Sequence, residues 1–252
     1  MAELFWFSDA QWAVIEPFMP TNQPGAHRVD DRRIVSGIVH LLRSGCRWRN
    51  CPAEYGPATT IYNHFNRWSR RGFWRAMLAT LAERGWIAET ASLDSTYVRA
   101  HRSAHGGKGG PRPQAIGPSR GGQTTKIHVL TDVLGRPAVI HLTPGNASDV
   151  TTAPDVLAAT PGRLRRLVAD RGYDADALRR DLRAMDTKPV IPGRRCRKRP
   201  IRHDKRRYRD RWRIEAAIGR LKDFRRVGTR YDKLAISLGS AIAIAAIVAC
   251  WF

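Results

Sequence analysis

Acidic residues are scarce in this chain. Its 252 residues include 22 Asp and Glu against 44 Lys and Arg, which gives a formal net charge of +22 at pH 7. A cation excess of this size is typical of proteins that bind a polyanion. We therefore expect nucleic-acid binding, and an anionic membrane surface is the main alternative.

Cysteine is also rare, and its placement argues against two classes of protein. The four cysteines are Cys46, Cys51, Cys196 and Cys250. Their spacing lacks the closely paired Cys or His ligands of a zinc site, and it supports no disulfide framework. We interpret all four as reduced thiols, and we expect a cytoplasmic, nucleoid-associated protein.

Targeting segments are lacking at the start of the sequence, where no basic stretch precedes an apolar run. One apolar segment, residues 234–252, is long enough to cross a bilayer. It contains Ser237, Gly239 and Ser240 and ends without a flanking charge. These features favour a buried terminal helix, so we expect no membrane partner.

Residues 1–86 show apolar side chains at helical spacing and predict a small all-α domain. A capping-box pattern at Ser8 starts the first helix. The second runs from Asp30 or Asp31 to Gly45, the third begins at Thr59 or Thr60, and the fourth covers residues 73–84. Residues 20–25 read as a turn-rich linker.

The third of these helices carries polar and basic side chains, Asn63, His64, Asn66 and Arg67. This pattern favours a helix-turn-helix-like DNA-binding domain over a plain helical bundle with a basic surface. The basic cluster Arg67, Arg70 and Arg71 would then contact phosphates.

Residues 87–252 change to a strand-rich pattern. We expect strands at 91–100, 124–131, 137–142, 164–169 and 189–191, and helices at 146–159, 173–185 and 208–222. Residues 103–122, rich in Gly, Pro and Ser, predict a flexible loop. Three strands in a meander followed by alternating helices and strands predict an α/β fold with a mixed sheet, the order of the ribonuclease-H-like fold.

Three carboxylates stand out in this second region. Asp94 lies inside the first strand, where Asp is unfavourable, and a metal ion or an arginine would compensate its charge. Asp170 follows the fourth strand, at the edge of a sheet where ligands gather. Glu215 lies on the helix at 208–222, in a stripe with Tyr208, Arg211 and Lys222.

These three acids can converge on one small volume. They would then repel one another unless a cation joined them. Oxygen-only ligands suit Mg²⁺, with Mn²⁺ as the alternative, rather than zinc. Two such ions can support cleavage of a phosphodiester, while the surrounding cations hold the DNA backbone.

The spacing Tyr208-x2-Arg211-x3-Glu215-x6-Lys222 resembles the Y-R-E-K signature of insertion-sequence transposases of the fourth and fifth family groups, which are DDE enzymes. Segments 93–97, 121–128, 169–174 and 230–233 are similar to the same family, as are segments 9–12 and 55–57 near the N-terminus. The resemblance covers nearly the whole chain.

The resemblance implies a ribonuclease-H-like catalytic domain at residues 87–252, with Asp94, Asp170 and Glu215 as catalytic metal ligands for two Mg²⁺ ions. It also implies cleavage and strand transfer at terminal inverted repeats, insertion into target DNA, and assembly of a dimer or larger complex on paired ends. Tyr208, Arg211, Lys222 and Lys126 would contact DNA.

Three other functions remain open at this point. A repressor would bind the element ends without cutting them, and a ribonuclease-H-like nuclease would cut without strand transfer. A tyrosine recombinase would use Tyr97, Tyr173 or Tyr208 as its nucleophile, but that chemistry needs no convergent acids.

Overall fold

The N-terminal part of the chain is helical, as predicted. The computed structural model describes residues 3–21, 30–87 and 89–252, so most of the predicted linker at 20–25 lies outside the described residues. The helices are α1 (Asp9–Ile15), α2 (Asp31–Ser44), α3 (Ala58–Arg70) and α4 (Phe73–Gly85). Short 3₁₀ turns lie at Glu16–Phe18, Trp48–Asn50 and Ala53–Tyr55.

Local sequence signals explain most of these boundaries. The capping box forms between Ser8 and Gln11, and Asp30 caps α2. Gly45 ends α2 with φ = 75°, a left-handed conformation that favours glycine. The predicted start of α3 at Thr59 or Thr60 is wrong, because the extended backbone of Pro57 occupies the N-cap position and the helix begins directly after it.

A mixed sheet forms the centre of the remaining chain. Its long strand β1 (Thr90–Ala100) is antiparallel to β3 (Gly122–Thr131), which pairs in turn with β4 (Pro137–Pro144). On its other side β1 is parallel to β5 (Arg166–Ala169), which pairs with β6 (Lys188–Val190). The order β4-β3-β1-β5-β6 confirms the predicted ribonuclease-H-like α/β fold.

Several strand and helix boundaries differ from the prediction. The expected loop at 103–122 includes a 3₁₀ turn and strand β2 (Gly117–Ser119), because this segment pairs with the start of β3. Helix α6 (Asp176–Ala184) begins three residues later than expected, since Arg171–Tyr173 form a 3₁₀ turn capped by Asp170. A short strand β7 (Thr229–Arg230) lies beside the end of β1.

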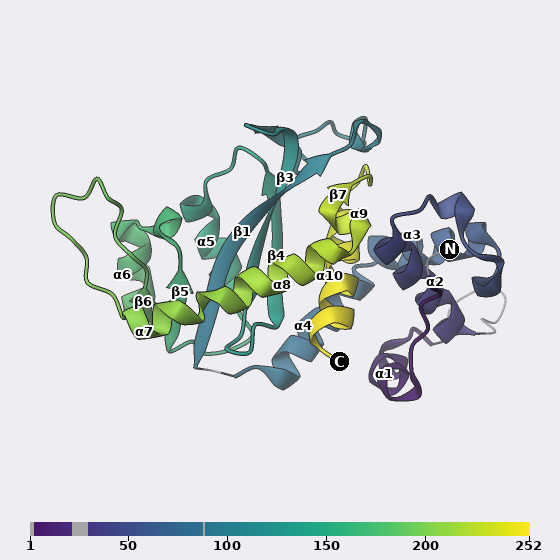
Figure 1. Cartoon of the computed structure of the whole chain (residues 1–252), viewed down its shortest axis with the longest axis horizontal. Coiled ribbons are helices and arrows are strands. Elements are labelled where there is room, and N and C mark those ends of the chain that lie inside the picture. Colours follow the sequence, from purple (N-terminus) through teal and green to yellow (C-terminus); the bar gives the residue numbers. More distant parts are fainter. Residues whose placement is uncertain (1–2, 22–29, 88) are drawn as a thin grey trace.

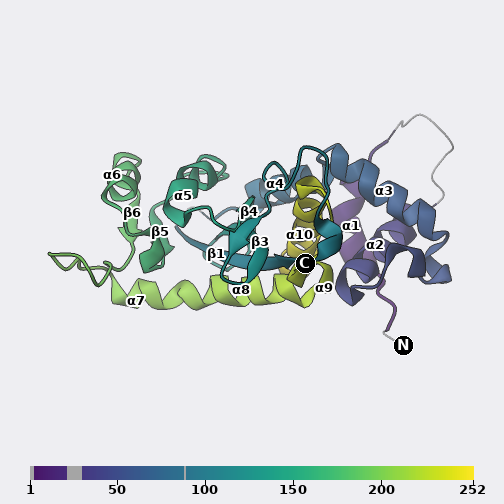
Figure 2. The same ribbon diagram turned by 90° about the horizontal axis from the view of Figure 1, so that it is seen from above.

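Helices cover both faces of the sheet (Figures 1 and 2). Helices α5 (Asp149–Ala158) and α6 lie on one face. The other face carries α8 (Trp212–Asp223), which continues the short α7 (Lys205–Tyr208) as one rod, and α10 (Ala235–Cys250), joined to α8 through α9 (Arg225–Gly228). Residues 237–247 of α10 are all buried, which confirms the predicted buried terminal helix.

No helix in the described part of the chain has the length and apolar character that a membrane span requires.

One hydrophobic core joins the N-terminal helices to the sheet. Leu41 and Trp68 from these helices share it with Ile127 of β3 and Ile242 of α10. A second core under α5 and α6 includes Leu93. At the predicted boundary between residues 86 and 87 the secondary structure changes, but the helices before it pack against the sheet after it. The division into two domains stays a prediction.

Candidate active site

Asp94 and Asp170 lie on neighbouring parallel strands. Leu93 of β1 pairs with Ala169, the last residue of β5. Asp94 directly follows Leu93, and Asp170 directly follows Ala169. Burial raises the pKa of Asp94 above its ordinary value; the negative charge of Asp170 raises it further, and Arg211 opposes both effects. The backbone N–H of Ser95 donates to Asp94 Oδ1 at 2.8 Å.

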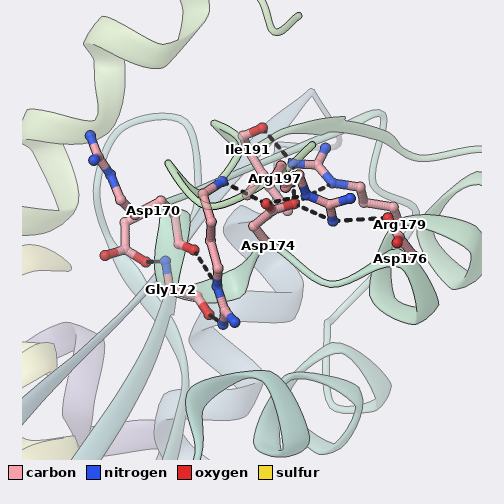
Figure 3. Close-up of polar contacts among 9 residues, drawn as sticks. Asp170, Gly172, Asp174, Asp176, Arg179, Ile191 and Arg197 are labelled. Carbon is pink, nitrogen blue, oxygen red and sulfur yellow. Dashed lines mark hydrogen bonds and ion pairs between the residues drawn. The ribbon is translucent and has the colours of Figure 1, made fainter. Parts of the chain in front are cut away.

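A tight turn fixes the second acid. Asp170 caps the 3₁₀ turn at Arg171–Tyr173, and its Oδ1 accepts a hydrogen bond from the backbone N–H of Gly172 at 2.7 Å (Figure 3). A Cβ atom on Gly172 would stand 2.8 Å from that oxygen. Glycine is therefore required for this orientation of the carboxylate.

Arg211 brings the third acid to the first. Its Nη1 donates to Asp94 Oδ2 and its Nη2 to Glu215 Oε1, both at 2.6 Å. Burial lowers the pKa of Arg211, but the charges of Asp94 and Glu215 outweigh burial and raise it. The helical stripe predicted from the sequence thus faces β1, and one guanidinium links two of the three acids.

Two further residues of the stripe lie close by. Lys222 Nζ donates to Thr96 Oγ1 on β1 at 2.6 Å, and burial lowers its pKa. The ring of Tyr208 packs edge-on against His203 at 5.3 Å between centroids. Lys222 therefore joins the helix of Glu215 to the strand of Asp94, whereas Tyr208 is the last residue of α7, three residues before Arg211.

The carboxylates suit a hard divalent cation in chemistry, since all their ligand atoms are oxygens. Among residues 3–21, 30–87 and 89–252, however, no three His, Cys, Asp or Glu side chains are arranged to hold a metal ion. Arg211 supplies the reason, because its guanidinium occupies the space between Asp94 and Glu215. A metal ion that joined these two acids would have to displace it.

Lys126 lies in a different environment from the one predicted. We expected a DNA contact, but Lys126 is 3% exposed. Its Nζ donates to the carbonyl of Ala147 at 2.6 Å and pairs with Asp149 at 3.1 Å. In this conformation its ammonium group is turned into the protein and away from any phosphate.

Asp149 contacts the strand of Asp94, which the sequence did not indicate. It accepts a hydrogen bond from Ser95 Oγ at 2.7 Å, directly after Asp94 in the chain. It lies within the helix predicted at 146–159 and is the first residue of α5. The scarcity of acidic residues in this chain was the one feature of the sequence that could have drawn attention to Asp149.

Tyr173 does not offer an activated nucleophile. Tyr173 is 1% exposed, and burial raises the pKa of its phenol, with further increases from Asp149, Asp94 and Asp170. Tyr97 is half exposed and its ring covers the ammonium group of Lys126 at 4.9 Å. A buried phenol with a raised pKa stays protonated and is a weak nucleophile.

A basic hollow lies on helix α3, far from the acids in the sequence. Asn63, Asn66, Arg67, Arg70 and Arg71 line a depression of about 470 Å³. His64 is instead buried, with its Nδ1 2.8 Å from the carbonyl of Thr60. Residues 45–57 connect α2 to α3, a longer connection than the turn of a helix-turn-helix, so that arrangement stays a prediction.

Comparison with known proteins identifies the family. A model described as a transposase DDE domain matches residues 86–250, and a model described as a putative transposase of the IS4/5 family matches residues 7–78. The putative transposase for insertion sequence element IS402 of Burkholderia cepacia is 32% identical over 154 residues, which cover 57% of this chain and 69% of that protein. The putative transposase for IS6501 of Brucella ovis is 35% identical over 114 residues, 44% of this chain and 85% of that protein.

Among solved structures, the piggyBac transposase in a synaptic complex with hairpin DNA has a similar fold. Its TM-score is 0.53 at 10% sequence identity, and the match covers 97% of this chain and 72% of that one. Since the DDE-domain match covers well over half of the sequence, the chain belongs to the DDE transposases, of the IS4/5 insertion-sequence type, which act on DNA.

Proposed function

We propose that Asp94, Asp170 and Glu215 are the three catalytic acids of this transposase and bind divalent metal ions. The observation that carries the proposal is the placement of Asp94 and Asp170 on adjacent parallel strands, with Arg211 linking Asp94 to Glu215. Carboxylates that share a site repel one another unless a cation lies among them or one of them is protonated. In the described conformation Arg211 supplies one positive charge.

The proposed ions are two Mg²⁺ per site, with Mn²⁺ as the alternative. When bound, they would help to deprotonate the attacking water and would stabilise the oxygen that leaves the phosphorus. The contribution of the chain is to hold the carboxylates in place. Burial and the turn at Gly172 restrict Asp94 and Asp170, whereas Glu215 is exposed on α8 and is oriented by Arg211.

The proposed substrate is double-stranded DNA. Water cleaves a phosphodiester at a terminal inverted repeat and leaves a 3′-hydroxyl, which then attacks a phosphodiester of target DNA in the same site. The proposed DNA contacts at the acids are Tyr208, Arg211 and Lys222. A cation beside the carboxylates would hold the DNA backbone against their negative charge.

A second DNA contact is proposed at the basic hollow of α3, through Arg67, Arg70 and Arg71, which are all exposed. For Lys126 we propose a structural role instead, because its ammonium group pairs with Asp149. We also propose that two or more copies assemble on paired ends and that the protein is cytoplasmic and nucleoid-associated.

A cleavage assay on the element's own ends tests the proposal. Asp94→Asn and Glu215→Gln should bind the ends but leave them uncut, and omission of Mg²⁺ should have the same effect. Cleavage by Asp94→Asn at the wild-type rate would contradict the assignment of Asp94 as a catalytic acid. It would favour a repressor that binds the ends while another protein cuts them. Pre-cut ends that fail to join plasmid DNA would favour a nuclease without strand transfer.

A further inference from the structure

A strongly basic segment connects β6 to α7 and projects from the end of the molecule as a long loop (Figures 1 and 2). We call residues 194–202 the basic arm. Its cations are Arg194, Arg195, Arg197, Lys198, Arg199 and Arg202. The arm contains no acidic residue, so its charge must be balanced from outside the segment.

One buried carboxylate anchors the start of the arm. The side chain of Asp174 is fully buried; its Oδ2 accepts from the backbone N–H of Arg194 at 2.7 Å and from Arg197 Nε at 2.6 Å. Its Oδ1 accepts from Arg179 Nε and Arg197 Nη2, each at 2.9 Å. Burial acts to raise the pKa of Asp174, but these donors outweigh it and lower the pKa to about 2.

The same anchor reaches the turn of the second catalytic acid (Figure 3). Arg194 Nη2 donates to the carbonyl of Gly172 at 2.9 Å, and its Nε to the carbonyl of Arg171 at 3.3 Å. Gly172 is also the residue whose N–H orients Asp170. The start of the arm and the Asp170 carboxylate are therefore fixed by one short stretch of backbone.

The cations of the arm fall into two groups. Arg194 and Arg197 are committed to the anchor. Arg195, Lys198, Arg199 and Arg202 are exposed, and within the described part of the chain their side chains form no hydrogen bond or ion pair. Four unneutralised cations, on a projecting loop whose start contacts the turn of Asp170, match the chemistry of a phosphate backbone.

We infer that the basic arm binds the DNA backbone beside the cut phosphodiester, and that Asp174 is a positioning residue that couples the arm to Asp170. The inference rests on the proposed function of Asp170. DNA bound by the exposed cations would contact a segment whose start is fixed by Asp174 and Arg194. The turn at Gly172 would then stay aligned with the bound strand.

The arm is tested with the double variant Arg195→Gln/Lys198→Gln and a DNA duplex of arbitrary sequence. We expect the slope of log affinity against log salt to fall by about one for each lost phosphate contact. Arg165→Gln is the control. Arg165 is exposed and lies directly before the first residue of β5, whereas Asp170 directly follows its last residue. A double variant with the wild-type salt slope would overturn the DNA contact.

Asp174 is tested with Asp174→Asn, checked for folding by thermal melting. We expect cleavage at saturating DNA to fall about 100-fold through misplacement of Asp170. Because Asp174→Asn leaves buried Arg179 without its carboxylate, Arg197→Gln serves as a second variant that keeps the Asp174–Arg179 pair. Wild-type cleavage rates in a folded Asp174→Asn or Arg197→Gln protein would overturn the positioning role.

Tryptic digestion gives a readout that needs no catalysis. DNA should protect the bonds after Arg195 and Lys198 in the wild type, and Asp174→Asn should expose them in the absence of DNA. Equal cutting with and without DNA would overturn the arm as a contact. Failure of the proposed function is separable, since it would appear as normal cleavage by Asp94→Asn.

Discussion

The guanidinium of Arg211 binds the carboxylate of Asp94 across 117 residues of sequence, with 2.6 Å between Nη1 and Oδ2. Arg211 also holds Glu215, one helical turn further along α8. A single side chain therefore compensates two acids that would otherwise repel each other. This contact makes Arg211 a competitor of any cation that the acids bind.

Replacement of Arg211 should change ion binding and DNA cleavage in opposite directions. In Arg211→Gln, Asp94 and Glu215 lose a positive neighbour, so we expect Mn²⁺ to bind about tenfold more tightly, a change of about 1.4 kcal/mol. Cleavage should fall, because the two carboxylates lose their alignment. Electron paramagnetic resonance of Mn²⁺ and the end-cleavage assay measure the two effects.

Arg209→Gln is the control for this prediction, since it removes the same charge from an exposed position two residues earlier. Mn²⁺ affinity that is equal in Arg211→Gln and Arg209→Gln would show that general charge, rather than the contact with Asp94, sets the affinity.

Lys126 should contribute to folding rather than to DNA affinity. It is buried beside Asp149, so Asp149→Ala leaves an unpaired buried ammonium group and should lower the free energy of unfolding by about 3 kcal/mol. Lys126→Met should leave the salt dependence of DNA binding unchanged. Urea titration and fluorescence anisotropy check the two expectations. A salt slope reduced by about one unit in Lys126→Met would restore the DNA contact predicted from the sequence.

Arg230 should be among the most sensitive positions for stability. It is fully buried, and its guanidinium donates to Thr125 Oγ1 and to the carbonyls of Gln114, Asp232 and Lys233. Arg230→Leu removes every one of these donors, so we expect a loss of about 3–5 kcal/mol in the free energy of unfolding. Arg183→Leu, at an exposed position of α6, should change it by less than about 0.5 kcal/mol. Similar urea midpoints for the two variants would refute this assignment.

Much of the fold followed from local signals. The capping box at Ser8, the glycine that ends α2 and the order of strands and helices predicted the helices and the sheet. The i, i+4 spacing of Arg211 and Glu215 predicted a shared helix face, and their ion pair bears it out. These features depend on residues close together in the chain.

The contacts that the sequence did not reveal are long-range. Nothing near Arg211 indicates that its partner is Asp94. The burial of Lys126 could not be predicted because β3 is buried on both faces over residues 124–131, which removes the alternation that marks an inward side chain. The contact between Asp149 and Ser95 spans 54 residues of sequence, and no local pattern indicates it.

His128 should make stability fall as the pH drops below 7. Burial lowers its pKa from 6.5 to about 4, with Lys126 and His141 adding to that effect and Asp149 opposing it. Between these two pKa values the unfolded chain binds a proton that the folded protein does not, so stability is present above pH 6.5 and is lost as pH falls toward 4. From pH 7 to 5.5 we expect a loss of about 1 kcal/mol in the free energy of unfolding from this residue.

Urea titrations at the two pH values test this expectation. Between them, the free energy of unfolding of His128→Gln should fall by correspondingly less than that of the wild type. His101→Gln, which removes an exposed imidazole, should behave as the wild type does, and an equal pH response in all three proteins would rule out His128 as the titrating group.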